Sequence, residues 1–230
     1  MRASPAERRA FVLEQTRIAP VPLAPEIRVC VARAVNQVWF ETARWLDDDN
    51  AEVPFWCVPW AGGQALARHL LDRPELVRGA RVLDFACGGG VVAIAAARAG
   101  ARVTAVDVDP LARTATVLAA EANGVAIDVR AGDLVGDPLS EVEVVLAGDV
   151  WYERGPAARF QRWFTRLAAR GTKVLTSDPG RGHPPRGVRE LASYEVPTPF
   201  DLEAAPSRTT RVLAIEPPPP RPAGRSRGAS

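Results

Sequence analysis

Acidic and glycine residues that could bind a charged cofactor gather first at Asp84-Phe85-Ala86-Cys87-Gly88-Gly89-Gly90. Glycines let the backbone turn tightly and approach a ligand closely, and the N-terminus of a following helix presents free N–H groups. The run is therefore a candidate cofactor loop. A purely structural glycine turn is the plainer alternative, because such loops are common.

The glycine loop fits two kinds of cofactor. Gly88, Gly90 and Ala93 satisfy G-x-G-x-x-A, the dinucleotide fingerprint. Asp84, Gly88 and Gly90 also match the D-x-G-x-G-x-G pattern of methyltransferases, with Ala86 in place of the first glycine. A carboxylate at Asp84 suits the ammonium and sulfonium charges of S-adenosylmethionine and gains nothing beside a pyrophosphate. The methyltransferase interpretation is therefore favoured, and the chain has no Tyr-x-x-x-Lys pair for hydride chemistry.

Two further acids follow later candidate strands. Asp107 lies 17 residues past Gly90, where a carboxylate can accept both hydroxyls of a ribose, although a loop or capping role is the alternative. Asp133 stands just after the next strand and is placed to accept a hydrogen bond from an adenine amino group. The adjoining Val108 and Leu134 are included in this predicted cofactor site.

Polar and aromatic residues also end the fourth candidate strand, in Gly148-Asp149-Val150-Trp151-Tyr152-Glu153. Ligands of doubly wound folds bind outside the carboxyl ends of the strands, so this is the expected acceptor site. The lysine side chain has a pKa of about 10.4 and must lose its proton before it can attack a methyl group. An apolar slot from Trp151 and Tyr152 would favour the neutral amine by desolvation, and Asp149 would orient it.

Plainer interpretations exist for these residues as well. Asp149 could cap a helix while the aromatic side chains belong to the core. Trp60, in Trp60-Ala61-Gly62-Gly63-Gln64, could wall one side of the cofactor, and a packing role is its alternative.

Short apolar runs alternate with helical patterns and would position these residues. The predicted strands are 81–85, 102–107, 126–129, 142–147 and 173–176, and the predicted helices are 61–71, 91–99, 110–123 and 156–169. Such alternation is typical of a parallel, doubly wound sheet with helices on both faces. Residues 194–196 and 211–215 are expected to add an antiparallel pair, and 26–46 is expected to be one helix.

The chain resembles the lysine methyltransferases of the electron-transfer flavoprotein β-subunit and their bacterial relatives. The resemblance rests on PFWCVPWAGGQALARHLLDRPELVRGARVLDFACGGG, followed by AVDVDP, AGDVWY and TSDPGR, and it extends from about residue 25 to 215. It implies a Rossmann-like, seven-stranded α/β methyltransferase sheet, mostly parallel with an antiparallel closing strand. It also implies S-adenosylmethionine as the cofactor and a lysine of a flavoprotein β-subunit-like protein as the substrate.

By this resemblance, Asp84, Gly88, Asp107 and Asp133 would be cofactor residues, and Asp149 and Tyr152 would line the acceptor site. The chain departs from the family pattern in Ala86 and Cys87 of the loop and in Trp151, which replaces a Phe-like residue.

Composition limits the other classes of function. The net charge is +2, and residues 217–230 hold three arginines and no acid, so the remainder carries −1. Nucleic-acid binding is therefore disfavoured. No apolar run approaches 18 residues, and the N-terminus lacks a signal-like stretch, so a cytoplasmic protein with no membrane span is expected. Three scattered cysteines indicate no metal site.

The expected organisation is a helical and loop extension (1–60), a methyltransferase domain (61–216) and a disordered tail (217–230) that is rich in Pro, Arg and Gly. A monomer is expected. Two other functions stay open: methylation of a small-molecule amine or hydroxyl, and binding of S-adenosylmethionine without catalysis. An RNA methyltransferase is more distant, because the body of the chain is not basic.

Overall fold

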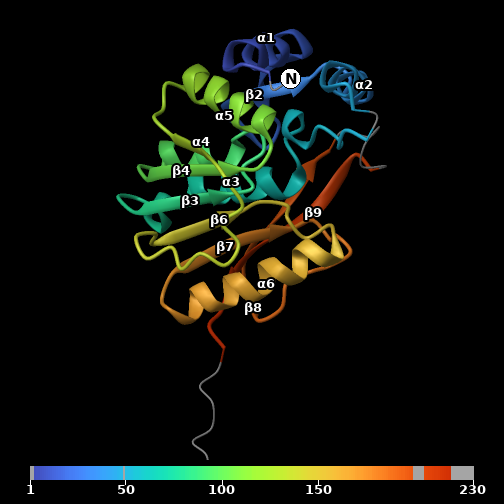
Figure 1. Cartoon of the computed structure of the whole chain (residues 1–230). Helices are drawn as coiled ribbons and strands as arrows, with labels where there is room; N and C mark the ends of the chain where they lie inside the picture. Colours follow the sequence, from blue (N-terminus) through green and yellow to red (C-terminus); the bar gives the residue numbers. More distant parts are fainter. Residues whose placement is uncertain (1–2, 49, 199–204, 219–230) are drawn as a thin grey trace, which may run out of the picture.

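A seven-stranded sheet forms the centre of the protein in the computed structural model, which describes residues 3–48, 50–198 and 205–218 (Figure 1). Its strands are β3 (Arg81–Phe85), β4 (Arg102–Asp107), β5 (Asp128–Ala131), β6 (Val144–Ala147), β7 (Lys173–Asp178), β8 (Val188–Pro197) and β9 (Ser207–Ile215). They lie in the order β5-β4-β3-β6-β7-β9-β8. β3 to β7 are mutually parallel, and β9 runs antiparallel between β7 and β8. The predicted fold class is confirmed.

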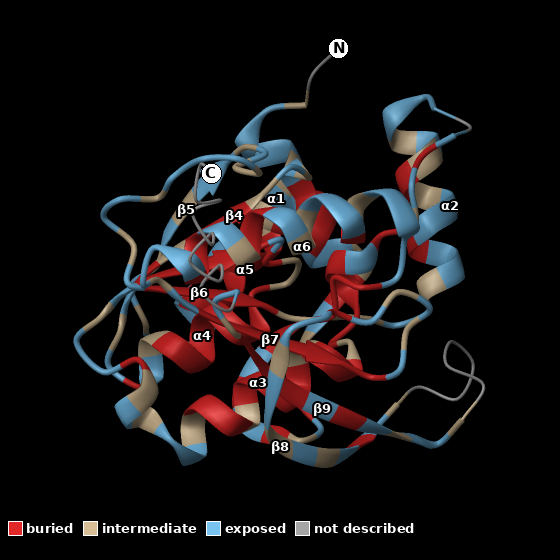
Figure 2. Cartoon of the chain, turned by 90° about the horizontal axis from the view of Figure 1, so that it is seen from below, coloured by how far each residue is buried: buried red, intermediate tan, exposed pale blue. Residues whose placement is uncertain are grey.

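Both faces of the sheet are buried because successive strand residues point to opposite sides. Val82 of β3 packs in one apolar cluster, and the next residue, Leu83, packs in the other. The buried residues accordingly concentrate in the middle of the molecule (Figure 2). A strand that is covered on both sides needs a continuous apolar run, and Val144–Ala147 is such a run.

Four helices cover the sheet. α3 (Ala61–Asp72), α4 (Val91–Arg98) and α5 (Pro110–Asn123) contribute to the cluster on one face, and α6 (Arg154–Ala169) covers the other. Their bounds agree with the predicted helices to within two residues. α5 shows why: the Asp109 carboxylate accepts the Leu111 N–H at 2.7 Å, Pro110 opens the first turn, and Gly124 ends the helix at φ 64°. No described helix is both long enough and apolar enough to cross a membrane.

The N-terminal region holds α1 (Pro5–Gln15), a hairpin of β1 (Thr16–Val21) and β2 (Ala24–Ala32), α2 (Val35–Leu46) and the short 3-10 turn η1 (Phe55–Cys57); a second such turn, η2 (Pro74–Leu76), follows α3. The helix predicted over 26–46 was wrong in its first part, which is β2. Ile27 and Val31 fit a helical period, but the buried pair Ile27 and Val29 shows the strand period. β-branched residues favour the strand.

The N-terminal region shares its core with the sheet domain. Val21, Ile27 and Val29 belong to the cluster that α3 and α4 bury, and Phe11 and Val12 pack with α5. The boundary predicted at residue 60 therefore divides the sequence but not the core, and the division into an extension and a domain stays a proposal. The tail prediction falls almost wholly on residues 219–230, outside the described residues, and only 217 and 218 are described.

Gln64 joins the hairpin to the domain. Its side chain is fully buried; Oε1 accepts the Leu23 N–H at 3.1 Å, and Nε2 donates to the carbonyl oxygen of Pro59 at 2.6 Å. We expect Gln64→Leu to lower the free energy of unfolding by about 1–3 kcal/mol, because it leaves these buried backbone groups unpaired. Urea denaturation measures this change.

Arg9→Ala is the matched control, because the exposed Arg9–Glu121 pair at 2.8 Å also joins the N-terminal region to the domain. An exposed pair contributes about 0–1 kcal/mol. Equal losses from the two substitutions would contradict this view of Gln64.

Candidate active site

The glycine loop between β3 and α4 has the backbone conformation that its glycines predict. Gly88 (φ 52°) and Gly90 (φ 84°) lie in the left-handed region, and so does Ala86 (φ 54°), which stands where the pattern has a glycine. A non-glycine residue there stores strain of about 1–3 kcal/mol. The loop therefore keeps the shape of the glycine-rich pattern despite the alanine.

Neighbouring segments press closely on this loop. A Cβ at Gly89 would lie 2.5 Å from the carbonyl oxygen of Trp56, and one at Gly90 would lie 3.0 Å from the Thr116 methyl carbon. The Thr116 hydroxyl donates to the carbonyl oxygen of Gly88 at 2.9 Å. η1 and α5 thus hold the loop from two sides, and any side chain at Gly89 would force η1 to move.

Asp84 ends β3 and is 1% exposed. One of its carboxylate oxygens, Oδ2, is buried without a hydrogen-bond partner among the described residues. Burial raises the pKa of Asp84 to about 8; the negative charge of Asp107 adds to this rise, and the backbone N–H of Ala93 opposes it. A buried carboxyl with an unsatisfied oxygen fits a cationic ligand group, which would supply both the missing donor and the compensating charge.

Asp107 ends β4, next to the glycine loop. Its Oδ2 accepts the Gly88 N–H at 2.9 Å, and its Oδ1 accepts the Asp109 N–H at 2.9 Å. Each oxygen keeps a second lone pair, so the carboxylate can still accept hydroxyl donors such as those of a ribose. Val108 is 68% exposed, which leaves an apolar surface for a flat ring beside Asp107.

Asp133 follows β5 and is already engaged. Its Oδ1 accepts the Val135 N–H at 3.0 Å, and its Oδ2 pairs with Arg159 of α6 at 2.9 Å. These two partners lower the pKa of Asp133. Leu134 packs against the apolar cluster under α6. Among the described residues, no hydrogen bond or ion pair joins Asp133 or Leu134 to Gly88–Gly90, so the cofactor role of these two residues stays a prediction.

Asp149, just after β6, is the most constrained acid of the acceptor region. It is 8% exposed and adopts φ 58°. Arg181 donates to both carboxylate oxygens, Nε to Oδ1 at 2.8 Å and a terminal nitrogen to Oδ2 at 2.9 Å. The Gly62 N–H also donates to Oδ2 at 3.1 Å. The carboxylate is therefore held by the first turn of α3 and by the turn after β7.

Glycines, which have no side chain, allow α3 and the segment around Asp149 to approach each other closely. A Cβ at Gly62 would lie 2.6 Å from the Asp149 Cβ, and one at Gly148 would lie 3.0 Å from the Gly63 Cα and 3.1 Å from the Val92 side chain. Because Val92 is in the first turn of α4, the acceptor region lies against the helix that follows the glycine loop. The candidate cofactor loop and the candidate methyl-acceptor region are therefore neighbours.

Aromatic residues of different segments meet beside Asp149. Tyr152 is 47% exposed, and its ring centroid lies 5.5 Å from that of Phe55 in η1. Phe55 in turn lies 6.0 Å from Trp60, whose ring faces the Arg181 guanidinium at 5.7 Å. Burial raises the pKa of Tyr152, so the phenol stays neutral near pH 7. These rings form an open apolar rim beside Asp149.

Trp151 differs from that expectation. It is 1% exposed, its ring packs against Phe164 of α6, and its Nε1 donates to the Thr176 hydroxyl at 2.8 Å. The structure therefore places the Trp151 side chain in the core, where it supports the Asp149 turn, and does not bring it into the rim. A residue directly after a strand can face either side of the sheet, which spacing alone does not decide.

Arg181 is a site residue for which the sequence predicts no role, although it belongs to TSDPGR, one of the segments that carry the family resemblance. A signal for it existed. β6 and β7 are adjacent parallel strands, so the acid after one and the base after the other meet at the same edge of the sheet. The sequence likewise predicts no role for Phe55, although this residue belongs to the PFWCVPW part of the resemblance.

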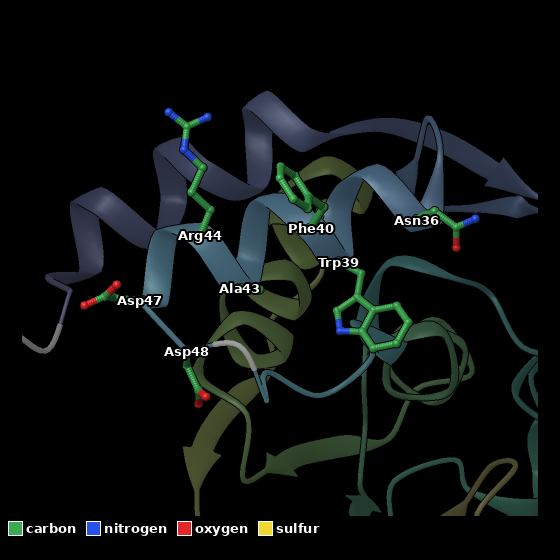
Figure 3. Close-up of a pocket in the computed structure, with 7 residues that line it drawn as sticks. All are labelled: Asn36, Trp39, Phe40, Ala43, Arg44, Asp47 and Asp48. Carbon is green, nitrogen blue, oxygen red and sulfur yellow. The ribbon is translucent and has the colours of Figure 1, made fainter.

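A separate hollow lies on the outer surface of α2 and contains none of the predicted site residues (Figure 3). Trp39 and Phe40 project from the helix there, 43% and 67% exposed. The described residues contain no group of three or more His, Cys, Asp or Glu side chains that could hold a metal ion.

Comparisons with known proteins agree with this geometry. The family model of ribosomal protein L11 methyltransferase (PrmA) matches residues 65–148, which include the glycine loop. Electron transfer flavoprotein beta subunit lysine methyltransferase of Xenopus laevis is 39% identical over 82% of this chain and 78% of the relative. The protein of the same name from Rattus norvegicus is 33% identical over 91% of this chain and 84% of the relative.

Solved structures show the same fold. A candidate RNA methyltransferase from Pyrococcus horikoshii aligns with a TM-score of 0.54 at 16% identity, covering 77% of this chain and 96% of that one. MtNAS in complex with MTA and tNA aligns with a TM-score of 0.51 at 17% identity, covering 80% and 71%. The two sequence relatives show that this chain belongs to the electron transfer flavoprotein beta subunit lysine methyltransferase family and is an S-adenosylmethionine-dependent methyltransferase.

Proposed function

We propose that the enzyme methylates a lysine side chain of an electron transfer flavoprotein β-subunit-like protein. The observation that carries this proposal is the 39% identity to a lysine methyltransferase of that subunit over 78% of the relative's length. The open aromatic rim at Tyr152 supports it, because a lysine on a protein surface needs an accessible mouth.

Residues at the ends of β3, β4 and β5 would hold S-adenosylmethionine. Asp84 would pair with its ammonium group, because its Oδ2 lacks a partner. The backbone of Ala86, Gly88 and Gly90 would face the ligand, and Asp107 would accept the ribose hydroxyls. Val108, Asp133 and Leu134 would bound the adenine, with Trp60 as a side wall.

When bound, S-adenosylmethionine supplies a methyl group activated by a sulfonium charge. That chemistry would be a displacement, in which the neutral amine nitrogen would form a bond to the methyl carbon as the carbon–sulfur bond breaks and sulfur keeps the bonding electron pair. Asp149 and Tyr152 would orient the amine for this in-line attack, and alignment of this kind is the main contribution a protein can make. Trp151 would act indirectly, by supporting the Asp149 turn.

Further proposals concern partners and location. We propose a protein substrate and no nucleic-acid substrate, since the chain without residues 217–230 carries a net charge of −1. We also propose a monomer in the cytoplasm. All three cysteines are buried and free, as is usual in a reducing compartment.

The pKa of Asp84 leads to a pH-dependent affinity for S-adenosylmethionine. Below about pH 8 the free protein holds this carboxyl protonated, so pairing with an ammonium group must release a proton. We expect the affinity to rise by up to about tenfold per pH unit between pH 6 and 8. Calorimetry in two buffers of different ionisation enthalpy measures both the affinity and the released proton.

Asp84→Asn should bind more weakly and release no proton from this position, whereas Glu14→Gln, an exposed acid far from the site in sequence, should behave as the wild type. The range ends at pH 8 because an α-amino group itself loses its proton at about pH 7.7–8.0. A wild-type affinity that is flat from pH 6 to 8 would contradict the role of Asp84.

Labelled S-adenosylmethionine tests the substrate directly. We expect the enzyme to label the β-subunit of purified electron transfer flavoprotein, with mass spectrometry placing the label on lysine. Asp149→Asn should lower the rate by about 100-fold, because a misaligned nucleophile loses that much.

Glu153→Gln is the matched control, since this exposed acid lies in the same turn and should leave the rate unchanged. Label on ribosomal protein L11 or only on small molecules would reject the proposed substrate. Binding of S-adenosylmethionine without transfer to any acceptor would favour the non-catalytic alternative.

A further inference from the structure

Arg181 and Asp149 form a largely buried ion pair at the centre of the acceptor site. Their side chains are 18% and 6% exposed, and both hydrogen bonds of the pair are shorter than 3.0 Å. A two-point contact between a planar guanidinium and a carboxylate is both strong and directional. The pair therefore sets the charge that an arriving amine meets.

The surroundings fix Arg181 in this position. Its backbone N–H and that of Gly180 donate to Oδ1 of the buried Asp178, at 2.9 and 3.0 Å. Oδ2 of Asp178 pairs with Arg211 at 3.0 Å. The ring of Trp60 covers the guanidinium at 5.7 Å. The arginine is thus a built part of the site.

A bare carboxylate would hinder the proposed reaction. It would attract the ammonium form of lysine and raise the pKa of that amine above its ordinary value of about 10.4. The nitrogen of an ammonium group has no lone pair to offer a methyl carbon. The acid that orients the amine would then also keep it unreactive.

The observed contacts remove this conflict. A carboxylate offers about four lone-pair positions, and three of those of Asp149 accept N–H groups of Gly62 and Arg181. Among the described residues Oδ1 accepts one hydrogen bond, so its second lone pair can accept a hydrogen bond from an amine. We infer that Arg181 is a positioning residue that neutralises the charge of Asp149, an inference that rests on the proposed lysine methylation. Asp149 can then orient the substrate amine without stabilising its proton.

Other charged groups surround this position and must be separated from Arg181. Glu52, Asp107 and Glu153 contribute negative charge at Tyr152, together with Asp149 itself. The Tyr152 phenol has a raised pKa and stays neutral around pH 7–9. His183 follows on the same turn as Arg181, and its backbone N–H donates to the carbonyl oxygen of Trp151 at 3.2 Å. Its imidazole therefore requires a control of its own.

The test is the pH profile of kcat at saturating flavoprotein and S-adenosylmethionine, because kcat reports groups that ionise in the enzyme–substrate complex. Arg181→Gln leaves the Asp149 carboxylate without a neighbouring positive charge. The acidic limb of the variant's pH profile should therefore move up by about one pH unit. The rate should therefore fall about tenfold on the acidic limb and approach the wild-type rate only at a pH above that limb. Arg181→Lys keeps the charge, and its limb should stay near that of the wild type.

Asp149→Asn provides a second measurement in the opposite direction. It leaves the positive charge of Arg181 beside the amine, so the acidic limb of its residual activity should move down. A folding defect lowers the rate at every pH and does not move limbs in opposite directions. This variant also keeps the inference testable if Arg181→Gln fails to fold.

His183→Gln is the matched control, since it removes an imidazole from the same turn without changing Asp149 or Arg181; it should keep the wild-type limb. The inference is overturned if the acidic limb stays at its wild-type pH in both Arg181→Gln and Asp149→Asn. It is also overturned if the limb shifts only in His183→Gln. Failure of the proposed function is distinguishable, because the wild-type enzyme would then not label the flavoprotein at any pH.

Discussion

The grip of three N–H groups on the Asp149 carboxylate is the constraint on which the acceptor half of the molecule depends. It joins the first turn of α3, the end of β6 and the turn after β7. The contact is possible only because Gly62 has no side chain, since a Cβ there would overlap with that of Asp149. It also accounts for the left-handed backbone of Asp149, which costs free energy that the ion pair with Arg181 offsets.

The donor half depends on an opposite arrangement. Asp84 is buried without a countercharge, and its raised pKa means that the fold favours the neutral carboxyl. Since the unfolded chain ionises this group at about pH 4, its contribution to stability is present at acid pH and is lost as the pH rises toward 8. A cationic ligand reverses that loss. The glycine loop is thus a place where the protein gives up stability that binding restores.

The sequence was informative where local rules decide the structure. The glycine loop, the capped helix α5 and the alternation of strands and helices follow from residue preferences and spacing, and the family resemblance named the acceptor motif. It was less informative where two periods fit the same residues, as at Ile27 and Val31, or where the side of the sheet matters. Trp151 was expected in the rim and lies in the core, whereas Phe55 supplies an aromatic ring from a segment almost 100 residues away in sequence.

Asp84 and Asp149 end neighbouring strands of one sheet, yet their surroundings give them different chemistry. An aspartate with no countercharge among the described residues can bind an ammonium group, because the pairing satisfies both charges. An aspartate whose charge is already compensated can accept a hydrogen bond from an amine without holding its proton. Methyl transfer to an amine needs both properties, a charged donor held firmly and an acceptor kept neutral. The environment of each carboxylate, and not the residue type, divides these tasks.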